Sequence, residues 1–419
     1  MINRIKNTYK IFGPGILMAT AAIGGSHLVA STQAGALFGW SLAIFILAVN
    51  FLKYPFFLAN VKYTMATKRS LIEGYASLGN AWLWLFTILA VIAAVVNTAA
   101  VSMFAASLLG YFIPIQLTIK LLSLIIIVAC LLILIAGKYN LLNNVSKIIM
   151  ISLSLATIVA VSMAVVQEAN TNIVDDFISP SPWTLASLGF IVILTGWMPA
   201  PIEISSISSI WLKNQIRETN INSKNALLDF NVGFIGTAIL AIFFLALGAL
   251  VLHGSAYEFK DGIAFADQLV TMYSSVIGDW SKLLIAFIAF ACMFGTSITV
   301  IDGYGRAVAE AFSLIKSKKS ASNKSVAIWT LFISIVGCLI ILFFTSSMRT
   351  MLDFAMILSF STTPIFAFLN YKLVKSTKLP KELQSGRFLN ILSILGLIFL
   401  FGFLILFIIY RWFPFLLGM

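Results

Sequence analysis

The chain has 419 residues, of which 60% are hydrophobic and only 10% are charged, and its mean hydropathy is +1.02. These values exclude a soluble globular domain, because polar side chains could not cover its surface. The formal net charge is +12, but the basic side chains lie in short loops between apolar stretches, which excludes nucleic acid as a partner. We predict an all-α integral membrane protein whose partners are the lipid bilayer and a small substrate.

Apolar stretches recur from one end of the chain to the other. Each has about 20 residues, which is long enough to cross roughly 30 Å of hydrocarbon. By this criterion we predict about eleven spans in a single transmembrane domain that covers residues 1–419. The predicted spans are residues 12–38, 42–67, 81–112, 118–136, 145–166, 184–211, 226–252, 282–312, 326–345, 351–372 and 388–412.

Charged side chains alternate between the loops. Basic residues fill the loop 372–387, whereas acidic residues fill the loops 167–183 and 253–279. The positive-inside rule therefore predicts a multi-pass protein of the cell (inner) membrane with a cytoplasmic N-terminus and, because the span number is odd, an external C-terminus. The charges near the first and fifth spans are Arg4, Lys6 and Lys10 on the predicted inner side and Glu168, Asp175 and Asp176 on the outer side.

Two of the predicted spans contain residues that interrupt a helix. The first span contains "GGSH" from Gly24 to His27, and the sixth contains Gly196, Pro199 and Pro201, which cannot all lie in an unbroken helix. Because the two breaks are five spans apart, they indicate a transporter built from inverted repeats, with its binding site at the breaks. The predicted first repeat is 12–166, the second is 184–372, and 388–412 is an additional helix.

The sequence lacks the motifs of an enzyme or an ATP-driven pump. It has no P-loop, no HExxH, no CxxC and no nucleophile elbow. We therefore expect neither enzymatic activity nor a cofactor.

Several motifs resemble those of one transporter family. The stretch "GPGILMATAAIGGSHLVASTQAGALFGWSL" resembles the first span of the Nramp divalent-metal transporters, "GWMPAP" resembles their sixth-span Met-Pro motif, and "GTSITVIDGYGRAVAEAF" resembles their eighth span. The order of spans matches along the whole chain. The resemblance implies a LeuT-type fold, alternating access, and a divalent metal ion carried together with protons between broken helices one and six.

The chain departs from the family at the residues that handle metal and protons. The family's Asp-Pro-Gly-Asn is replaced by Gly24, Gly25, Ser26 and His27, and the family's sixth-span histidine is replaced by Ala200. The third span has no acidic residue, and Asn97 is its most polar residue at mid-membrane. The sequence therefore predicts a divergent member that keeps the scaffold but has a different site.

The resemblance and the residue chemistry together give a candidate site. His27 and Met198 offer nitrogen and sulfur ligands to a metal ion. Glu203 is the nearest carboxylate; it follows Pro199 by four residues and is therefore expected about one helical turn into the second half of the sixth span. Glu203 has a second interpretation, as an acid at the positive end of a half-helix. The predicted substrate-binding residues are Gly24, Gly25, Ser26, His27, Trp197, Met198, Ala200 and Glu203.

The altered site leaves the substrate class open. Gly24, Gly25 and Ala200 make room and expose backbone groups at half-helix ends, which suit a small organic solute or anion as well as a hydrated cation. Trp197 would then form an apolar wall, although packing is the more common role of a Trp. A non-transporting solute sensor is a further alternative.

A second set of ionisable residues is predicted to act in proton coupling or gating. His27 and Glu203 belong to it as residues near the breaks. Asp302, Arg306 and Glu310 follow at i, i+4 and i+8 of the eighth span and are expected to form an ion-pair ladder on one face. Within the second span Lys53 requires either a polar partner or a path to the interface.

Overall fold

The computed structural model describes residues 13–115, 117–136, 139–167, 177–219, 221–255, 258–317, 320–343 and 347–414, and these residues form helices and connecting segments without any β-strand. Arg4, Lys6, Lys10, Glu168, Asp175 and Asp176, on which part of the topology prediction rests, lie outside these residues. The longer helices are α4 (Ala43–Thr67), α6 (Asn80–Gly110), α7 (Ile119–Ile135), α8 (Tyr139–Val166), α11 (Ser223–Val251), α13 (Lys282–Ile315), α14 (Asn323–Phe343), α15 (Met348–Ser376) and α16 (Arg387–Trp412). The shorter elements are α2 (Pro14–Ala22), η1 (Ser26–Ser31), α3 (Thr32–Phe38), α5 (Leu71–Leu78), η2 (Leu185–Ser187), α9 (Leu188–Trp197), α10 (Ile204–Thr219), α12 (Gly262–Ile277), η3 (Asp279–Ser281) and η4 (Lys381–Leu383).

Each predicted span coincides with one helix or with a pair of helices. Among the described residues, eight helices are long and apolar enough to cross a membrane, and the bent pair Pro14–Ala22 and Ser26–Phe38 makes a ninth. The predicted fourth span and the first half of the predicted sixth are shorter apolar helices, Ile119–Ile135 and Leu185–Trp197. The all-α membrane fold predicted from the sequence is confirmed.

The first span breaks at its glycines. Helix α2 ends at Ala22, and the chain bends by 46° before it continues as η1, a π-helix that starts at Ser26, and then as α3. π-Helical turns place an extra residue in the turn and often occur at functional sites. Here the side chains of Ser31 and Thr32 reach back to the carbonyl oxygens of Ser26 and His27, at 3.2 and 3.3 Å.

The start of the first span is held by α11. The backbone N–H groups of Gly13 and Gly15 donate to the carboxylate of Asp229, at 3.1 and 2.7 Å. A Cβ on Gly15 would lie 2.3 Å from the backbone carbonyl oxygen of Asp229, so only glycine allows this contact. The "GPG" stretch thus begins α2 with an acid that satisfies its free amides and complements the helix dipole.

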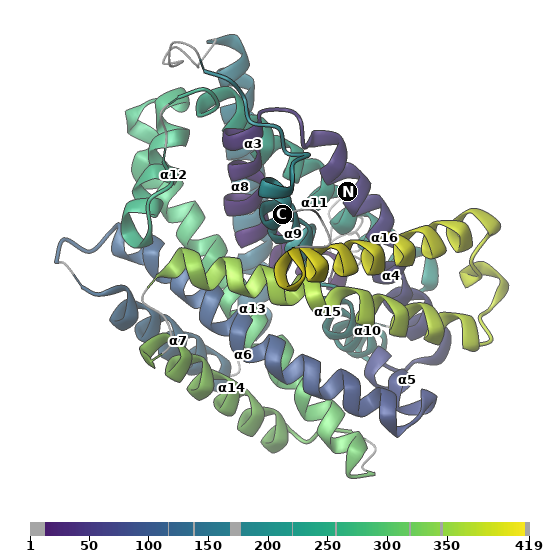
Figure 1. Cartoon of the computed structure of the whole chain (residues 1–419). Coiled ribbons are helices and arrows are strands. Elements are labelled where there is room, and N and C mark those ends of the chain that lie inside the picture. Colours follow the sequence, from purple (N-terminus) through teal and green to yellow (C-terminus); the bar gives the residue numbers. More distant parts are fainter. Residues whose placement is uncertain are drawn as a thin grey trace, which may run out of the picture.

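The sixth span breaks between α9 and α10. Helix α9 ends at Trp197, residues 198–203 are not helical, and the Met198–Pro199 peptide bond is cis. Figure 1 shows α9 and α10 next to α15 and α4, near the centre of the bundle. Both spans predicted to be interrupted are therefore interrupted in the structure.

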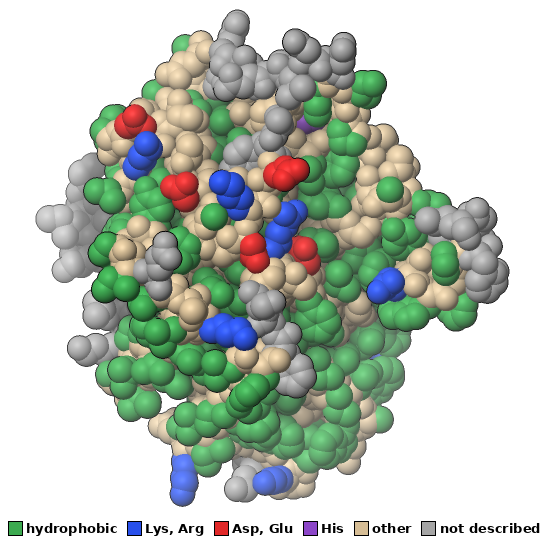
Figure 2. All heavy atoms as spheres, turned by 60° about the vertical axis from the view of Figure 1, so that its left-hand side comes forward, with side chains coloured by type: hydrophobic (Ala, Val, Ile, Leu, Met, Phe, Trp, Pro, Cys, Tyr) green, Lys and Arg blue, Asp and Glu red, His purple; other side chains and the backbone are tan. Residues whose placement is uncertain are grey.

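The remaining helices form the frame around the two breaks. Helices α6 and α13 pack along each other, α11 covers the first span, and α15 covers α9. Helices α7 and α14 lie together at one edge, and α16 packs across α4 and α15 (Figure 1). The face on the side of α7 and α12 carries a group of acidic and basic side chains bordered by hydrophobic ones (Figure 2). Exposed apolar side chains such as Ile44 and Ile135 fit a surface in contact with lipid.

Candidate functional site

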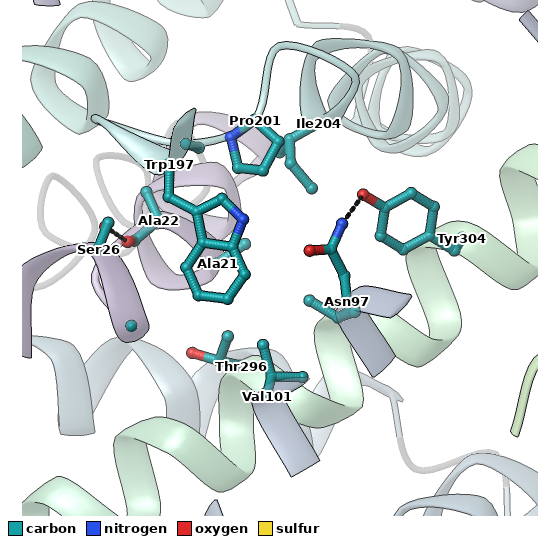
Figure 3. A pocket seen from close by; sticks show the side chains of 13 residues that line it. Ala21, Ala22, Ser26, Asn97, Val101, Trp197, Pro201, Ile204, Thr296 and Tyr304 are labelled. Atoms are coloured by element: carbon teal, nitrogen blue, oxygen red, sulfur yellow. Dashed lines mark hydrogen bonds between the residues drawn. The ribbon is translucent and has the colours of Figure 1, made fainter. Parts of the chain in front are cut away.

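A small cavity lies where the two broken spans meet. Its volume is about 30 Å³, which is room for about two water molecules. Figure 3 shows that its walls come from the first span, the sixth-span break, α6 and α13. The residues that line it are Ala21, Ala22, Gly25, Ser26, Asn97, Val101, Trp197, Ala200, Pro201, Ile204, Thr296, Val300 and Tyr304.

The indole of Trp197 closes one side of this cavity. A Cβ on Gly25 would lie 2.4 Å from Cζ3 of Trp197, so the indole ring occupies the place that a side chain at position 25 would need. The indole Nε1 donates to the hydroxyl of Ser359 on α15, at 3.0 Å. Gly25, predicted to make room for a substrate, makes room for Trp197 in this conformation.

His27 faces away from the cavity. Its Nε2 lies 2.9 Å from the carbonyl oxygen of Thr237 on α11, and its Nδ1 lies 2.7 Å from the hydroxyl of Ser26 and 3.1 Å from the carbonyl oxygen of Ala22. Its ring is edge-on to Phe244. Because a carbonyl oxygen only accepts, Nε2 must carry a hydrogen and has no lone pair for a metal. In this conformation His27 joins the first span to α11.

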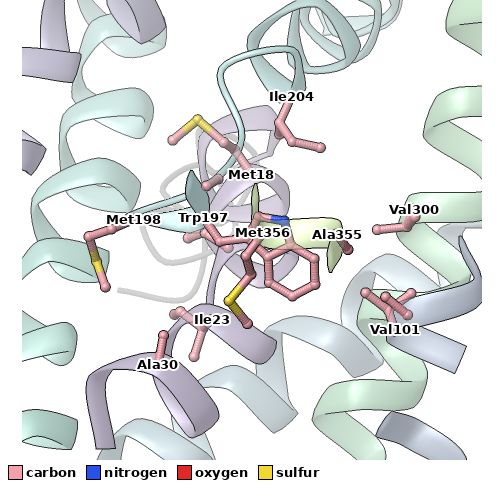
Figure 4. Close-up of a cluster of buried hydrophobic side chains, with 14 of the residues drawn as sticks. Met18, Ile23, Ala30, Val101, Trp197, Met198, Ile204, Val300, Ala355 and Met356 are labelled. Carbon is pink, nitrogen blue, oxygen red and sulfur yellow. The ribbon is translucent and has the colours of Figure 1, made fainter. Parts of the chain in front are cut away.

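The other predicted metal ligand also lies outside the cavity. Met198 is fully buried in a hydrophobic cluster that includes Met18, Met356 and Trp197 (Figure 4). Among the described residues, no group of three or more His, Cys, Asp or Glu side chains is placed to hold a metal ion. His27 is therefore not part of such a group among the described residues.

Of the two predicted small residues Gly24 and Ala200, Ala200 lines the cavity and Gly24 does not. A Cβ on Gly24 would lie 3.1 Å from side-chain atoms of Thr296 and 3.2 Å from the sulfur of Met293, both on α13. A side chain at position 24 would thus be directed toward Thr296, which lines the cavity.

Glu203 takes part in a buried chain of polar groups. It lies in the turn just before α10, and not one turn inside the half-helix as predicted. The hydroxyl of Tyr304 donates to Oε1 of Glu203 at 3.1 Å and accepts from Nδ2 of Asn97 at 2.9 Å. The sequence marked Asn97 as unusually polar, but it gave Tyr304 no role. A tyrosine within an apolar span was the signal that could have found it.

Two oxygens of this hydrogen-bonded series from Asn97 to Glu203 have no hydrogen-bond partner among the described residues. They are Oδ1 of Asn97 and Oε2 of Glu203, and both residues are nearly fully buried. An unpaired buried acceptor carries a desolvation cost of about 1–3 kcal/mol. Because Asn97 lines the cavity, its free oxygen is available to a ligand or a water molecule there.

Lys53 binds the C-terminal end of α9, where the sixth-span break begins. Its ammonium is fully buried and donates to the carbonyl oxygens of Thr195 and Gly196, at 2.6 and 3.4 Å. These carbonyls belong to the last turn of α9, where intrahelical partners are missing. Lys53 therefore finds its partner in the break, and does not reach the interface.

The predicted charge ladder of the eighth span is divided between two partners. Arg306 pairs with Asp302 at 2.7 Å, one turn apart on α13. Glu310 pairs instead with Lys213 of α10 at 3.1 Å, and Lys213 also pairs with Glu73 of α5 at 2.7 Å. None of these five residues lines the cavity, so they connect helices at some distance from it.

Two broken helices that meet at a small cavity with a few polar groups in a mostly apolar lining, framed by packed spans, define the class of the protein as a membrane transporter with a LeuT-type fold. Residues 15–410 match the family model described as "Natural resistance-associated macrophage protein-like". The chain belongs to this family, Nramp.

One relative is similar to this chain in sequence, and three solved structures are similar to it in fold. The chain is 48% identical to a Pasteurella multocida (strain Pm70) protein described as "Uncharacterized protein PM0681". The alignment spans 402 residues, which are 96% of this chain and 92% of the relative. The fold is similar to that of the Eremococcus coleocola manganese transporter in complex with an aromatic bis-isothiourea substituted compound, with a TM-score of 0.70, 15% identity, and coverage of 96% of this chain and 86% of that one.

The same fold recurs in solved structures that hold other small molecules. Mhp1, a nucleobase-cation-symport-1 family transporter with bromovinylhydantoin bound, matches with a TM-score of 0.59 and 15% identity over 96% of this chain and 92% of its own. MhsT in complex with L-phenylalanine matches with a TM-score of 0.61 and 13% identity over 93% and 98%. These likenesses establish the LeuT-type fold.

Proposed function

We propose that this protein is a secondary active transporter of the cell (inner) membrane that works by alternating access, with the cavity between the two broken spans as its substrate site. The observation that carries the proposal is that both breaks contribute to one cavity, with Gly25 and Ser26 from the first span and Trp197 and Ala200 from the sixth. Half-helix ends at such breaks present unpaired backbone groups to a substrate. The N-terminus is proposed to be cytoplasmic and the C-terminus external.

The first proposed substrate is a divalent metal ion, which keeps some of its water. Family membership supports a metal, and so does the fold shared with a manganese transporter. The cavity offers neutral oxygen donors, above all the free Oδ1 of Asn97 and the hydroxyls of Ser26 and Tyr304. Neutral oxygens bind hard divalent ions more weakly than carboxylates do, so binding is expected to be weak in comparison with a site that contains an aspartate.

Protons are the proposed coupling ion, and Glu203 is the proposed proton carrier. Its carboxylate lies one hydrogen bond from Tyr304, which lines the cavity, and its second oxygen has no partner among the described residues. A carboxylate placed in this way can change its protonation state when the substrate arrives. His27, whose ring is tied to α11, is a weaker candidate in this conformation.

A small neutral organic solute is the second candidate. It is favoured by the lining, because no charged side chain lines the cavity among the described residues. A solute larger than about two water molecules would require the Trp197 ring to move, since the cavity measures about 30 Å³. A solute sensor remains the third candidate, and solute counterflow would separate it from a transporter.

The deciding experiment is Mn²⁺ flux into proteoliposomes with the internal pH recorded at the same time. Metal transport predicts saturable flux that falls strongly in Asn97→Leu. Asn60→Leu is the matched control, because Asn60 is a buried asparagine outside the cavity whose Oδ1, like that of Asn97, has no partner among the described residues. Acidification that accompanies flux in the parent protein and is lost in Glu203→Gln would support proton coupling. Absence of Mn²⁺ flux from folded protein would reject the metal and favour the organic solute.

A further inference from the structure

A second and much larger cavity lies away from the breaks. Its volume is about 660 Å³, and it is enclosed by α4, the C-terminal half of α15, the connecting segment 377–386 and the beginning of α16 (for these helices see Figure 1). It shares no lining residue with the cavity at the breaks. The proposed transport mechanism therefore leaves this cavity without a role.

The charge of this cavity is one-sided. Lys62, Lys375 and Lys378 line it, and no Asp or Glu of the described residues does. These lysines come from two different helices and from the segment between α15 and α16. Ammonium groups that lie near one another repel each other. An anion in the cavity would offset this repulsion between the three lysines.

Lys62 is the strongest sign that a ligand belongs here. It is only 6% exposed, and its one hydrogen bond among the described residues is donated to the hydroxyl of Ser385, at 2.8 Å. An ammonium has three donors, so two remain, and no carboxylate of the described residues forms an ion pair with it. A buried cation with a single neutral partner is costly unless an anion accompanies it.

The walls of the cavity combine these charges with apolar surface. Phe56, Leu389 and Ile394 line it together with the lysines. Ile394 is half exposed on α16 and continues into a row of exposed apolar side chains on that helix, such as Ile391 and Ile398. A ligand with an anionic head and an apolar tail would place its head among the lysines and its tail along α16.

We propose that this cavity binds a phosphate group, and that its apolar wall favours an anionic phospholipid over free phosphate as the source. The lysines lie at the end of the bundle where basic loops are predicted to face the cytoplasm, and basic pockets between spans on that side suit anionic headgroups. The lipid would connect α4, α15 and α16, and so fix α16 to the bundle. This site is independent of the substrate site and of the proposed function.

The test compares the unfolding temperature of the full-length protein in mixed micelles that contain phosphatidylglycerol or phosphatidylcholine, with inorganic phosphate as a third condition. A ligand that binds only the folded state raises the unfolding temperature. We expect a rise with phosphatidylglycerol alone, which Lys375→Gln/Lys378→Gln loses for the most part. Both lysines are exposed, so this variant should fold even if Lys62→Gln does not. Lys324→Gln, an exposed lysine on α14, is the matched control and should keep the full rise.

Each other outcome overturns the proposal or its lipid part. An equal rise in the double variant and in the parent would show that the lipid acts elsewhere. A rise with inorganic phosphate, and none with phosphatidylglycerol, would overturn the lipid as the source. No rise in any condition, with the parent protein folded, would overturn phosphate binding altogether.

Discussion

The ammonium of Lys53 lies 2.6 Å from the carbonyl oxygen of Thr195, although the two residues are 142 positions apart in the chain. Helix α9 ends two residues later, at Trp197, so this carbonyl has no intrahelical partner. On the other side of the break Glu203 lies just before α10. The protein thus supplies a cation at the negative end of one half-helix and an acid at the positive end of the next.

Replacement of Lys53 should destabilise the protein. Lys53→Met would leave the carbonyl oxygens of Thr195 and Gly196 buried without a donor, and hydrogen bonds to charged groups contribute about 1.5–3 kcal/mol. We expect the free energy of unfolding to fall by about 2 kcal/mol, measured as a lower unfolding temperature in detergent. Lys324→Met, at an exposed position, is the control. Unchanged stability of Lys53→Met would mean that water can replace the ammonium at this break.

Gly25→Ala should abolish transport without unfolding the protein. Its Cβ would lie 2.4 Å from the indole of Trp197, and the ring would have to leave the contact with Ser359. Substrate flux and intrinsic tryptophan fluorescence would both report the displacement. Gly402→Ala on α16 is a matched control, because nothing lies within 4 Å of its added Cβ. Normal flux through Gly25→Ala would show that the position of Trp197 does not matter for transport.

An acid at position 24 should strengthen the binding of a divalent cation. Gly24→Asp would direct a carboxylate toward Thr296 at the cavity wall, and carboxylates are the ligands that hard cations prefer. We expect Mn²⁺ to bind roughly tenfold more tightly, equivalent to about 1.4 kcal/mol, in titration calorimetry. Gly24→Asn has nearly the same size without the charge, so equal affinities in the two variants would contradict an electrostatic effect. Uptake of an organic solute should decrease in both.

The ion pairs of Lys213 should be important for stability. Lys213, Glu73 and Glu310 have side chains that are only 8%, 12% and 8% exposed, and removal of the shared cation would leave two acids nearly buried. Breaking a buried ion pair costs about 3–5 kcal/mol, so Lys213→Met should lower the unfolding temperature markedly.

The exposed pair of Lys282 and Asp279 provides the comparison. Surface ion pairs contribute only about 0–1 kcal/mol, so Lys282→Met should change the unfolding temperature very little. Similar effects of Lys213→Met and Lys282→Met would mean that the Lys213 cluster is hydrated in the membrane-embedded protein.

The sequence by itself determined the fold class, the location of the spans and the two breaks. These features are local, because a run of about 20 apolar residues is long enough to span the bilayer and closely spaced Gly and Pro residues, as at positions 24–25 and 196–201, disfavour a continuous helix. The motifs around the breaks also carried the resemblance to the Nramp family, and the family model matches residues 15–410.

Only the tertiary structure decided which side chains face the cavity. Helical periodicity predicts the direction of a side chain only within a continuous helix, and it is lost at a break. His27 consequently turns to α11, whereas Asn97 and Tyr304, which lie on unbroken helices, reach the cavity.

The hydrogen-bond partners of the buried polar groups could not be predicted from the sequence either. Glu203 and Tyr304 are 101 positions apart, and Asn97 and Tyr304 are 207 apart. A buried polar group must find a hydrogen-bond partner somewhere in the fold, but its own sequence neighbourhood does not specify which one. That choice depends on how the helices pack, and packing brings together residues from distant parts of the chain.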